Sequence, residues 1–449
     1  MLKEVFIQRV VDPFFWKLLK GSNRYQYYLS MEKKQWQPLE QNRQEQAKKL
    51  FQIISYAEKN IPYYKKMIRD NELSYSEETI FSDILKFPIL TKEIIKDNSS
   101  DLTNPSMQGV LDSSGGSTGE PITIMHGKKA LDYIAATKTL CKSWAGRKPG
   151  ELIIKLWGSD RDIMQGGQGI NGVLVEAATN TILLNTFRMS ESDMEGYIQL
   201  INKKHPKLIV AYVQSAYEIA RFALENNIHI SPPSGIMVSA GTLYPHFREE
   251  IQKAFGCPVF NRYGCREVGD IAFDCDKHEG LHLNTFHHYL EILDEDLIPI
   301  QKEGEKGEVY VTTLNEFKMP LIRYKVGDIA TFTSHACSCG RGLPILKAVH
   351  GRDVDLFINF NGELIDGEYF THLFYFSDWV KQFQLVQKTV DFIEIKVVKR
   401  KEENKEDIAN ITDKIKLVMG KDCVISWIFV EEISVSKSGK YRYTISLVK

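Results

Sequence analysis

The spacing of apolar residues divides the chain into segments of different secondary structure. Residues 1–75 show helical spacing, and a proline opens a short helix within NIPYYKK (60–66). From residue 151, short apolar runs of strand length alternate with amphipathic segments of helical length. The apolar runs are ELIIKLW (151–157), TILLN (181–185), LIVAY (208–212), GIMVSAG (235–241) and PVFNRYG (258–264), and the amphipathic segments cover 191–204, 214–227 and 244–255. Buried strands that alternate with helices predict an α/β layer with a largely parallel sheet.

The pattern changes at residue 281, where strand-like runs follow one another without helices between them. These runs are LHLNTFHHYLEIL (281–293), GEVYVTTL (307–314) and IATFT (329–333), and they predict an antiparallel β section. Further along, strand-like runs at 392–400 and 423–430 flank a helical segment at 408–419. We therefore expect an α/β protein with a large N-terminal domain (1–350), containing mixed and parallel α/β layers and a β section. A small, mobile α+β C-terminal domain (351–449) would follow it.

Composition and charge narrow the classes of function. The chain has 449 residues, of which 43% are hydrophobic and 26% charged, as in soluble globular proteins. A formal net charge of −1 provides no general attraction for nucleic acid. No apolar run approaches the ~18 residues that a membrane-spanning helix requires, although residues 1–20 are apolar and basic enough for peripheral membrane contact. Seven cysteines without a secretion signal indicate a reducing cytoplasm.

The segment SSGGSTGEP (113–121) is the first candidate for chemistry. Backbone N–H groups of such a glycine-rich loop can converge on an anion, and the hydroxyl groups of Ser114, Ser117 and Thr118 add donors for phosphate oxygens. A surface turn can have the same composition, so this segment alone does not decide between the two. Further candidate segments are NRYGCREVGD (261–270), LIRYKVGD (321–328), GRDVD (351–355) and KSGKYRYTIS (437–446). We expect YGCRE at the carboxyl edge of the sheet, Asp328 directly after a strand, and GRDVD at a hinge.

These segments, taken in order, resemble a known family. SGGSTGEP, YGCRE, RYKVGD, GRDVD and SGKYR are similar to motifs of the adenylate-forming superfamily of acyl-CoA synthetases, luciferases and peptide-synthetase adenylation domains. The most similar branch holds the phenylacetate–CoA ligases and the related capsule-biosynthesis adenylate-forming proteins, in which NIPYYKK and MPLIRY also occur. The resemblance runs from about residue 50 to the end of the chain. It implies that ATP activates a small carboxylic acid as an acyl-adenylate, with release of pyrophosphate and with Mg²⁺ as cofactor.

The resemblance also implies roles for individual residues. The residues implied in ATP binding are Ser114, Gly115, Gly116, Ser117, Thr118, Gly119, Ala240, Gly241, Thr242, Tyr263, Gly264, Asp328 and Arg352. Tyr263 would stack on adenine, and Asp328 would bind the ribose hydroxyl groups. The catalytic residues would be Glu267 and Thr118, which would hold Mg²⁺, and Lys440, a mobile lysine that stabilises charge as the adenylate forms. Tyr212, Ser239 and Tyr263 would line the acid pocket.

Three functions are compatible with this resemblance. The first is transfer of the acyl group to CoA, and the second is transfer to an amine in polysaccharide or small-molecule biosynthesis. The third is a nucleotide-binding protein of this fold without catalysis. Two departures from the family pattern, Glu120 in place of lysine and Arg266 in place of Thr or Ser, suit the capsule-type branch. These departures leave the identity of the acyl acceptor more open than the adenylation step.

A separate set of residues has the composition of a zinc site. Cys275 and His278 in CDKH, with Cys337 and Cys339 in CSCGR, supply the ligands of a Cys₃His centre, and His282 is a substitute for the fourth ligand. Four protein ligands leave no open coordination position, so such a zinc ion would be structural. The alternative is a group of ordinary cysteines and histidines that bind no metal.

Overall fold

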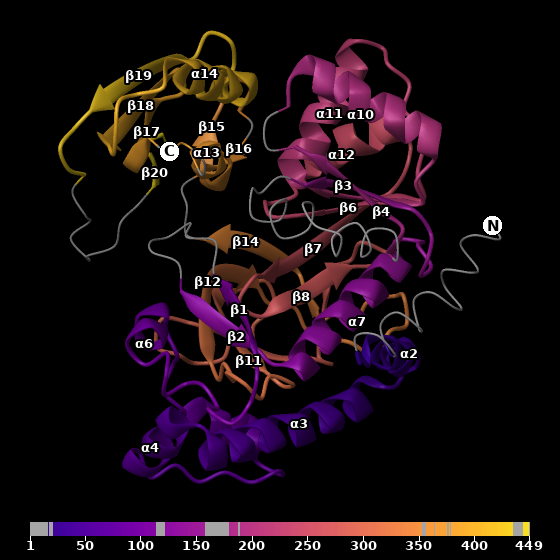
Figure 1. Cartoon of the computed structure of the whole chain (residues 1–449), viewed down its shortest axis with the longest axis vertical. Coiled ribbons are helices and arrows are strands. Elements are labelled where there is room, and N and C mark those ends of the chain that lie inside the picture. The colour runs from indigo at the N-terminus through magenta and orange to yellow at the C-terminus, as the bar shows by residue number, and fades with distance from the viewer. Residues whose placement is uncertain are drawn as a thin grey trace. The chain divides into compact units, whose positions relative to one another are not determined.

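The structure is a computed structural model that describes most of the chain (Figure 1). The described residues are 17, 21–113, 122–157, 179–186, 189–352, 356–362, 364–374, 377, 379–433 and 443–448. They form two compact units, one of residues up to His350 and one from Gly351 onward. The boundary between the units therefore falls at the first residue of the GRDVD segment.

Helices occupy much of the chain before the first strand. They are α2 (Arg24–Lys34), α3 (Leu39–Asn60), α4 (Pro62–Asp70), α5 (Ile80–Asp83) and α6 (Lys92–Asp97). In α3 the fully buried residues Leu50, Ile53, Ile54 and Ala57 recur at helical spacing. Pro62 is the first residue of α4, a position whose N–H has no partner within a helix, so the ring costs no hydrogen bond. From residue 24 to residue 70 the structure thus has helices where the sequence predicts them.

The first unit is built around an eight-stranded sheet. Among the described residues its order is β13-β9-β8-β7-β6-β5-β3-β4. The strands are β3 (Ile153–Trp157), β4 (Thr181–Asn185), β5 (Leu208–Tyr212), β6 (Gly235–Ser239), β7 (Val259–Cys265), β8 (Gly269–Asp274), β9 (Leu281–Leu283) and β13 (Ile345–Leu346). The strands from β4 to β7 pair in parallel, whereas those from β7 to β13 pair antiparallel. The parallel section predicted from the alternating runs is therefore confirmed.

Helices cover both faces of the parallel section (Figure 1). On one face α10 (Glu191–Lys204), α11 (Val213–Glu225) and α12 (Pro245–Phe255) pack against a core that includes Ile154, Ile209 and Ile236. On the other face α7 (Lys128–Trp144) and α2 pack against the neighbouring residues Ile153 and Leu208. Successive strand residues point to opposite faces, which is why these strands read as continuous apolar runs.

A second sheet of the first unit has the order β10-β11-β12-β14. Its strands are β10 (His288–Leu293), β11 (Lys306–Thr313), β12 (Tyr324–Thr331) and β14 (Ala348–Arg352). The expected antiparallel β section is present, but the run 281–293 contributes to two sheets, because β9 joins the first sheet and β10 the second. The break lies at Asn284, whose side-chain amide donates to the Asp270 carbonyl and holds the chain where it leaves the first sheet.

The second unit is an α+β structure. Its four-stranded sheet has the order β19-β18-β17-β20, and β15 and β16 form a separate two-stranded sheet. The elements are β15 (Leu356–Ile358), β16 (Leu364–Asp366), α13 (Gly367–Leu373), β17 (Val380–Thr389), β18 (Phe392–Lys399), α14 (Lys405–Met419), β19 (Val424–Phe429) and β20 (Thr444–Ser446). Ile411 and Ile415 of α14 pack against Ile393 and Ile395 of β18 in one buried core. The small α+β domain predicted from the sequence has this architecture.

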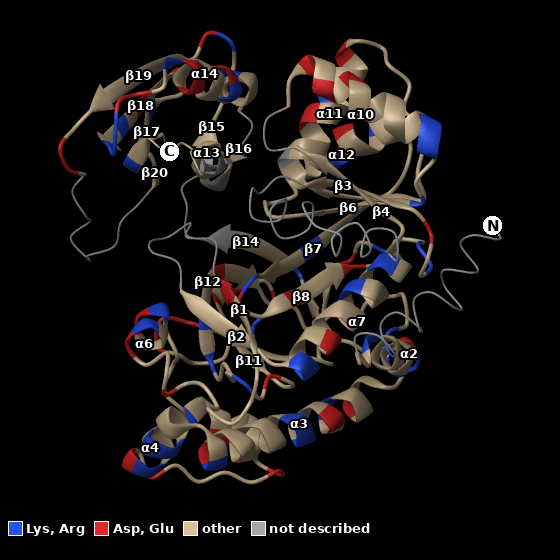
Figure 2. Cartoon of the chain, viewed as in Figure 1, with Lys and Arg blue, Asp and Glu red and all other residues tan. Residues whose placement is uncertain are grey.

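Charged side chains of both signs are interspersed along the helices, as α3 and α4 illustrate in Figure 2. This distribution agrees with the near-zero net charge. Within the described ranges, the structure contains no helix whose length and apolar character would let it cross a bilayer. The N-terminal residues considered for peripheral membrane contact lie, except for Lys17, outside the described residues.

A buried ion pair joins three segments of the first unit. Arg323 is 1% exposed and has a left-handed backbone with φ of +51°. Its Nη2 donates to Oε1 of Glu291 in β10 at 2.8 Å. Its Nη1 donates to the carbonyl oxygens of Leu85 and Phe87, at 2.9 and 2.7 Å. The guanidinium group therefore links β10 and the start of β12 to the chain segment before α6.

We predict that Arg323→Met lowers the free energy of unfolding of the first unit by about 3–5 kcal/mol, because it leaves the Glu291 carboxylate buried without its partner. The double variant Arg323→Met/Glu291→Met should recover much of this loss, since no unpaired charge remains. Arg69→Met removes only an exposed pair with Asp70 and should change stability by less than about 0.5 kcal/mol. Urea unfolding followed by tryptophan fluorescence measures all three. Equal loss in the single and double variants would contradict the explanation.

Candidate active site

The carboxyl edge of the parallel strands brings the expected acid-pocket residues together. Tyr212 ends β5 and Ser239 ends β6, and the two are register partners in the sheet. The Tyr212 ring lies against Trp157 at the end of β3, with ring centroids 4.1 Å apart. Ala240 follows β6 with a φ of +57° and is exposed, so the chain turns sharply at AGT (240–242). Two strand ends and a tight turn thus form one edge, as expected for a ligand site in an open α/β sheet.

Tyr263 and Gly264 lie at an irregularity in the β7–β8 pairing. The register shifts between these two residues. A Cβ atom added at Gly264 would lie 2.5 Å from the carbonyl oxygen of Gly269, closer than side chains approach backbone atoms. Only glycine allows this approach of the two strands, which accounts physically for the Tyr-Gly pair in the YGCRE segment.

Asp328 lies beside Tyr263 in the structure. The Tyr263 hydroxyl donates to Oδ2 of Asp328 at 2.8 Å, although the residues belong to different sheets. The expectation that Asp328 directly follows a strand is wrong, because β12 runs through it from Tyr324 to Thr331. Gly327, with a φ of +91°, distorts the strand just before Asp328. The residues expected at adenine and ribose are thus direct neighbours.

Glu267 occupies the turn between β7 and β8 and is buried. The Tyr324 hydroxyl donates to Glu267 Oε1 at 3.3 Å, and the Nζ atom of Lys92 lies 3.9 Å from the same oxygen. The carboxylate therefore has both a hydrogen-bond donor and a positive charge beside it. Sequence reasoning missed Lys92, the first residue of α6, because a lysine in the polar stretch TKEIIKDN carries no signal of its own.

Cys265 lies close to the same acidic groups. Burial raises the pKa of its thiol well above the usual value, and the negative charges of Glu267 and Asp328 raise it further. The sulfur therefore stays protonated at neutral pH, and a protonated thiol is a poor nucleophile. This agrees with a site that works through positioning and charge rather than through a cysteine.

Several expected site residues lie outside the described residues. These are Ser114, Gly115, Gly116, Ser117, Thr118, Gly119, Lys440 and the hinge residues Asp353–Asp355, and of Arg352 only the backbone, in β14, is described. The strands on either side of the glycine-rich segment, β1 (Val110–Ser113) and β2 (Thr123–His126), pair antiparallel, with Ser113 opposite Thr123. The roles of these residues in ATP binding and catalysis therefore stay predictions.

The residues expected at zinc are found together, with one exchange. The ligand atoms of Cys275, His282, Cys337 and Cys339 all lie within 4.8 Å of one another. His278 is not in this group, because its Nδ1 atom lies 2.7 Å from Asp274 Oδ2 and 3.1 Å from Arg248 Nη1. The histidine beside the three sulfurs is His282, the substitute, and the expectation for His278 is corrected accordingly.

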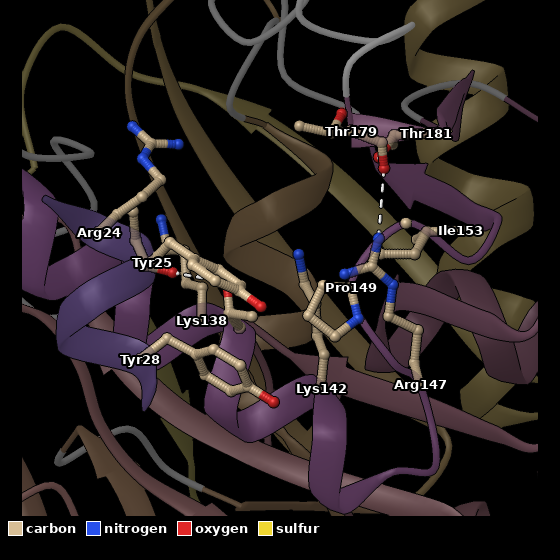
Figure 3. Close-up of a pocket in the computed structure, with 13 residues that line it drawn as sticks. Arg24, Tyr25, Tyr28, Lys138, Lys142, Arg147, Pro149, Ile153, Thr179 and Thr181 are labelled. Atoms are coloured by element: carbon tan, nitrogen blue, oxygen red, sulfur yellow. Dashed lines mark hydrogen bonds between the residues drawn. The ribbon is translucent and has the colours of Figure 1, made fainter. Parts of the chain in front are cut away.

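A cavity of about 150 Å³ lies between α2, α7 and the starts of β3 and β4 (Figure 3). Its cationic lining residues are Arg24, Lys138, Lys142 and Arg147. Burial lowers the pKa of Lys142 well below its usual value, and the charges of Lys155 and Arg147 lower it further. The lining residues Ile153 and Thr181 begin their strands, so this cavity is at the edge opposite Tyr212 and Ser239. It is therefore separate from the expected adenylation site.

Comparison with known proteins gives relatives of both expected kinds. Protein CapK of Staphylococcus aureus is 26% identical over 429 residues, which cover 90% of this chain and 89% of CapK. A phenylacetate-coenzyme A ligase of Thermus thermophilus is 24% identical over 372 residues, covering 80% of this chain and 82% of the relative. Residues 357–447 match the family model described as the CapK C-terminal domain. These similarities support an adenylate-forming ligase.

The fold of this adenylate-forming ligase agrees with a solved structure. The crystal structure of 2-hydroxyisobutyryl-CoA ligase in complex with 2-HIB-AMP and CoA superposes with a TM-score of 0.62 at 16% identity. The match covers 93% of this chain and 92% of that chain. The architecture expected from the motifs is thereby confirmed.

We predict that Gly264→Ala in this ligase costs about 1–3 kcal/mol of stability and weakens ATP binding, because the new methyl group forces β7 away from β8 beside Tyr263. Gly196→Ala in α10 is the matched control, since its Cβ would meet nothing within 4 Å. That change should be neutral or stabilise by about 0.5–1 kcal/mol, because alanine favours a helix. Thermal unfolding and calorimetric ATP titration report both effects. Unchanged ATP affinity in Gly264→Ala would refute a role in ATP binding for the irregular β7–β8 pairing at Gly264.

Proposed function

We propose that the protein uses ATP to activate a small carboxylic acid as an acyl-adenylate and then transfers the acyl group to CoA. The observation that carries the proposal is the Tyr263–Asp328 hydrogen bond beside the buried Glu267, at the carboxyl edge of the sheet. This arrangement offers an aromatic ring, a carboxylate for hydroxyl groups and a second carboxylate for a cation within one site. Similarity to phenylacetate-coenzyme A ligases supports CoA as the acceptor.

The first step is a substitution at the α-phosphorus of ATP. An oxygen of the substrate carboxylate forms a bond to this phosphorus, and the bond to the bridging oxygen breaks, so pyrophosphate leaves with the electron pair. Little covalent help is needed, because the barrier depends on positioning and on cancellation of negative charge. In the proposal, the Tyr263 ring stacks on adenine while Asp328, held by the Tyr263 hydroxyl, accepts hydrogen bonds from the ribose.

Glu267 is the residue that would hold Mg²⁺. Carboxylate oxygen is a ligand type that Mg²⁺ prefers, so the buried Glu267 side chain fits the ion. When bound, the ion would neutralise charge on the phosphate oxygens. Lys92, with its Nζ atom 3.9 Å from Glu267 Oε1, places a positive charge beside the carboxylate. Lys440 would add the mobile positive charge for the adenylation step.

An amine acceptor is the second candidate. Protein CapK matches along most of this chain, and the second unit matches the CapK C-terminal domain. In this version the adenylate forms in the same way, and an amine nitrogen attacks the acyl carbon, forming an amide and releasing AMP and a proton. Arg266 precedes Glu267 at a position where Thr or Ser is usual. This difference favours a binding site that is altered around the acceptor or around the substrate carboxylate.

We predict acid-dependent exchange of labelled pyrophosphate into ATP when a panel of aryl, alkyl and amino acids is tested with Mg²⁺. Lys440→Ala should slow this exchange by about 10²–10³-fold, because it removes charge stabilisation in the transition state. ATP affinity, measured by calorimetry, should stay nearly unchanged in the same variant. Lys437→Ala, three residues away, is the matched control and should exchange like the wild type. Equal exchange in wild type and Lys440→Ala would disprove the role given to Lys440.

The acceptor is decided by a second measurement on the acid that supports exchange. We expect product to form with CoA, seen as a thioester by mass spectrometry with AMP release, and no amide with amino sugars or amino acids. The attacking thiol sulfur forms the new bond, and AMP leaves from the acyl carbon. Amide formation without any thioester would establish the amine acceptor instead and overturn the CoA assignment.

A further inference from the structure

Three cysteine sulfurs and one histidine nitrogen converge in the first unit, away from the residues discussed for adenylation. Cys275 Sγ lies 3.6 Å from Cys337 Sγ, and Cys339 Sγ lies 3.4 Å from His282 Nε2. Around a tetrahedral Zn²⁺ with Zn–S of about 2.3 Å and Zn–N of about 2.0–2.1 Å, the corresponding separations are about 3.8 and about 3.5 Å. Two of the six separations among these atoms therefore already match a zinc coordination shell, and all six are within 4.8 Å.

The surroundings of these atoms provide independent support. The backbone N–H groups of Lys277 and Arg341 point at Cys275 Sγ and Cys339 Sγ, at 3.4 and 3.5 Å. Each donor follows its cysteine by two residues, so a tight turn aims N–H groups at a sulfur that carries negative charge when it binds metal. His282 Nδ1 lies 3.4 Å from the Leu343 carbonyl oxygen, which can accept a hydrogen bond from an Nδ1–H group. In that tautomer the Nε2 lone pair faces the sulfurs.

We propose that Cys275, His282, Cys337 and Cys339 bind one Zn²⁺ ion in a closed, structural site. Three thiolates and one neutral imidazole give the centre a net charge of −1. The adjacent Arg341, whose side chain is nearly buried, places a positive charge beside it. Four protein ligands leave no position for substrate or water, so the ion takes no part in acyl transfer. This proposal does not depend on the identity of the acid or acceptor.

The metal would stabilise a loop that holds the N-terminal helices. Cys337 and Cys339 lie on the loop between β12 and β13, while Cys275 follows β8 and His282 lies in β9. Beyond the cysteines, the Arg341 guanidinium lies over the rings of Trp36 and Trp144, at 4.6 and 4.2 Å from their centroids. Zinc would thus fix the loop that contacts the end of α2 and the end of α7.

Further hydrogen bonds extend this contact. Arg341 Nε and Trp144 Nε1 both donate to Gln35 Oε1, at 3.0 and 2.7 Å. Gly342 N donates to the Gln35 carbonyl, and Asn42 of α3 donates its amide to the Gly342 carbonyl at 2.7 Å. A loop without its metal would leave these buried donors and acceptors less firmly paired, so metal loss should be felt first between α2 and α3.

The test is the metal content of the full-length protein after purification without affinity metals. We expect about one zinc ion per chain by mass spectrometry of the elements, and a Co²⁺-substituted protein with the visible absorption of tetrahedral thiolate coordination. His282→Asn and Cys339→Ser should each reduce the zinc content at least about fivefold. His278→Asn is the matched control and should keep the full zinc content, since His278 pairs with Asp274 instead.

Hydrogen exchange on the wild-type chain gives a test that needs no variant to fold. Removal of zinc by a chelator should speed exchange in residues 335–343 and 35–42, and added Zn²⁺ should reverse this. Absence of zinc from the purified chain, together with no uptake from added Zn²⁺, would overturn the proposal. Loss of zinc in His278→Asn with retention in His282→Asn would overturn the ligand set.

Discussion

The buried Arg323–Glu291 pair is the contact on which the arrangement around Glu267 in the first unit depends. Arg323 starts the segment that becomes β12, and its carbonyl accepts the N–H of Leu90 while Leu90 in turn accepts from Lys325. Two neighbours of this bridge lie beside Glu267. Tyr324 donates a hydrogen bond to its carboxylate, and Lys92, two positions after Leu90, lies 3.9 Å from it. The ion pair therefore fixes the position of β12 relative to the segment before α6. A buried charge with one partner and fixed donors tolerates few alternative arrangements, which favours a single geometry at the site.

The residues proposed to bind the nucleoside come from two sheets that meet. Tyr263 comes from the strand where the first sheet changes from parallel to antiparallel, and Asp328 comes from the second sheet. Each residue is set by a local departure from regular strand geometry, a register shift beside Gly264 and a left-handed Gly327. The glycines in YGCRE and KVGD thus act on the site through backbone geometry.

Local patterns predicted the elements better than they predicted their partners. The segment 191–204 is a helix with the expected bounds, because amphipathic spacing and a capping box at Ser190 are encoded within the segment itself. The division of 281–293 between two sheets was not visible, because strand pairing depends on residues far away in sequence. The same limit explains why the sequence did not single out Lys92 and gave His282 only as a substitute ligand. Lys92 matters only through its distance to Glu267, and His282 rather than His278 faces the sulfurs because β9 pairs with β13.

The division of the chain suggests where the difference between CoA and amine transfer should be sought. The described residues proposed to bind ATP and Mg²⁺, Tyr263, Glu267 and Asp328, all belong to the first unit, whereas the match to the CapK C-terminal domain lies wholly in the second. Adenylation makes the same charge demands whatever the acceptor, so the first unit has little reason to differ between the two kinds of ligase. The acceptor attacks only after pyrophosphate has left. It must therefore bind to side chains that complement its own chemistry. In the proposed reaction, residues 357–447 are therefore the part of the chain in which acceptor specificity would be encoded.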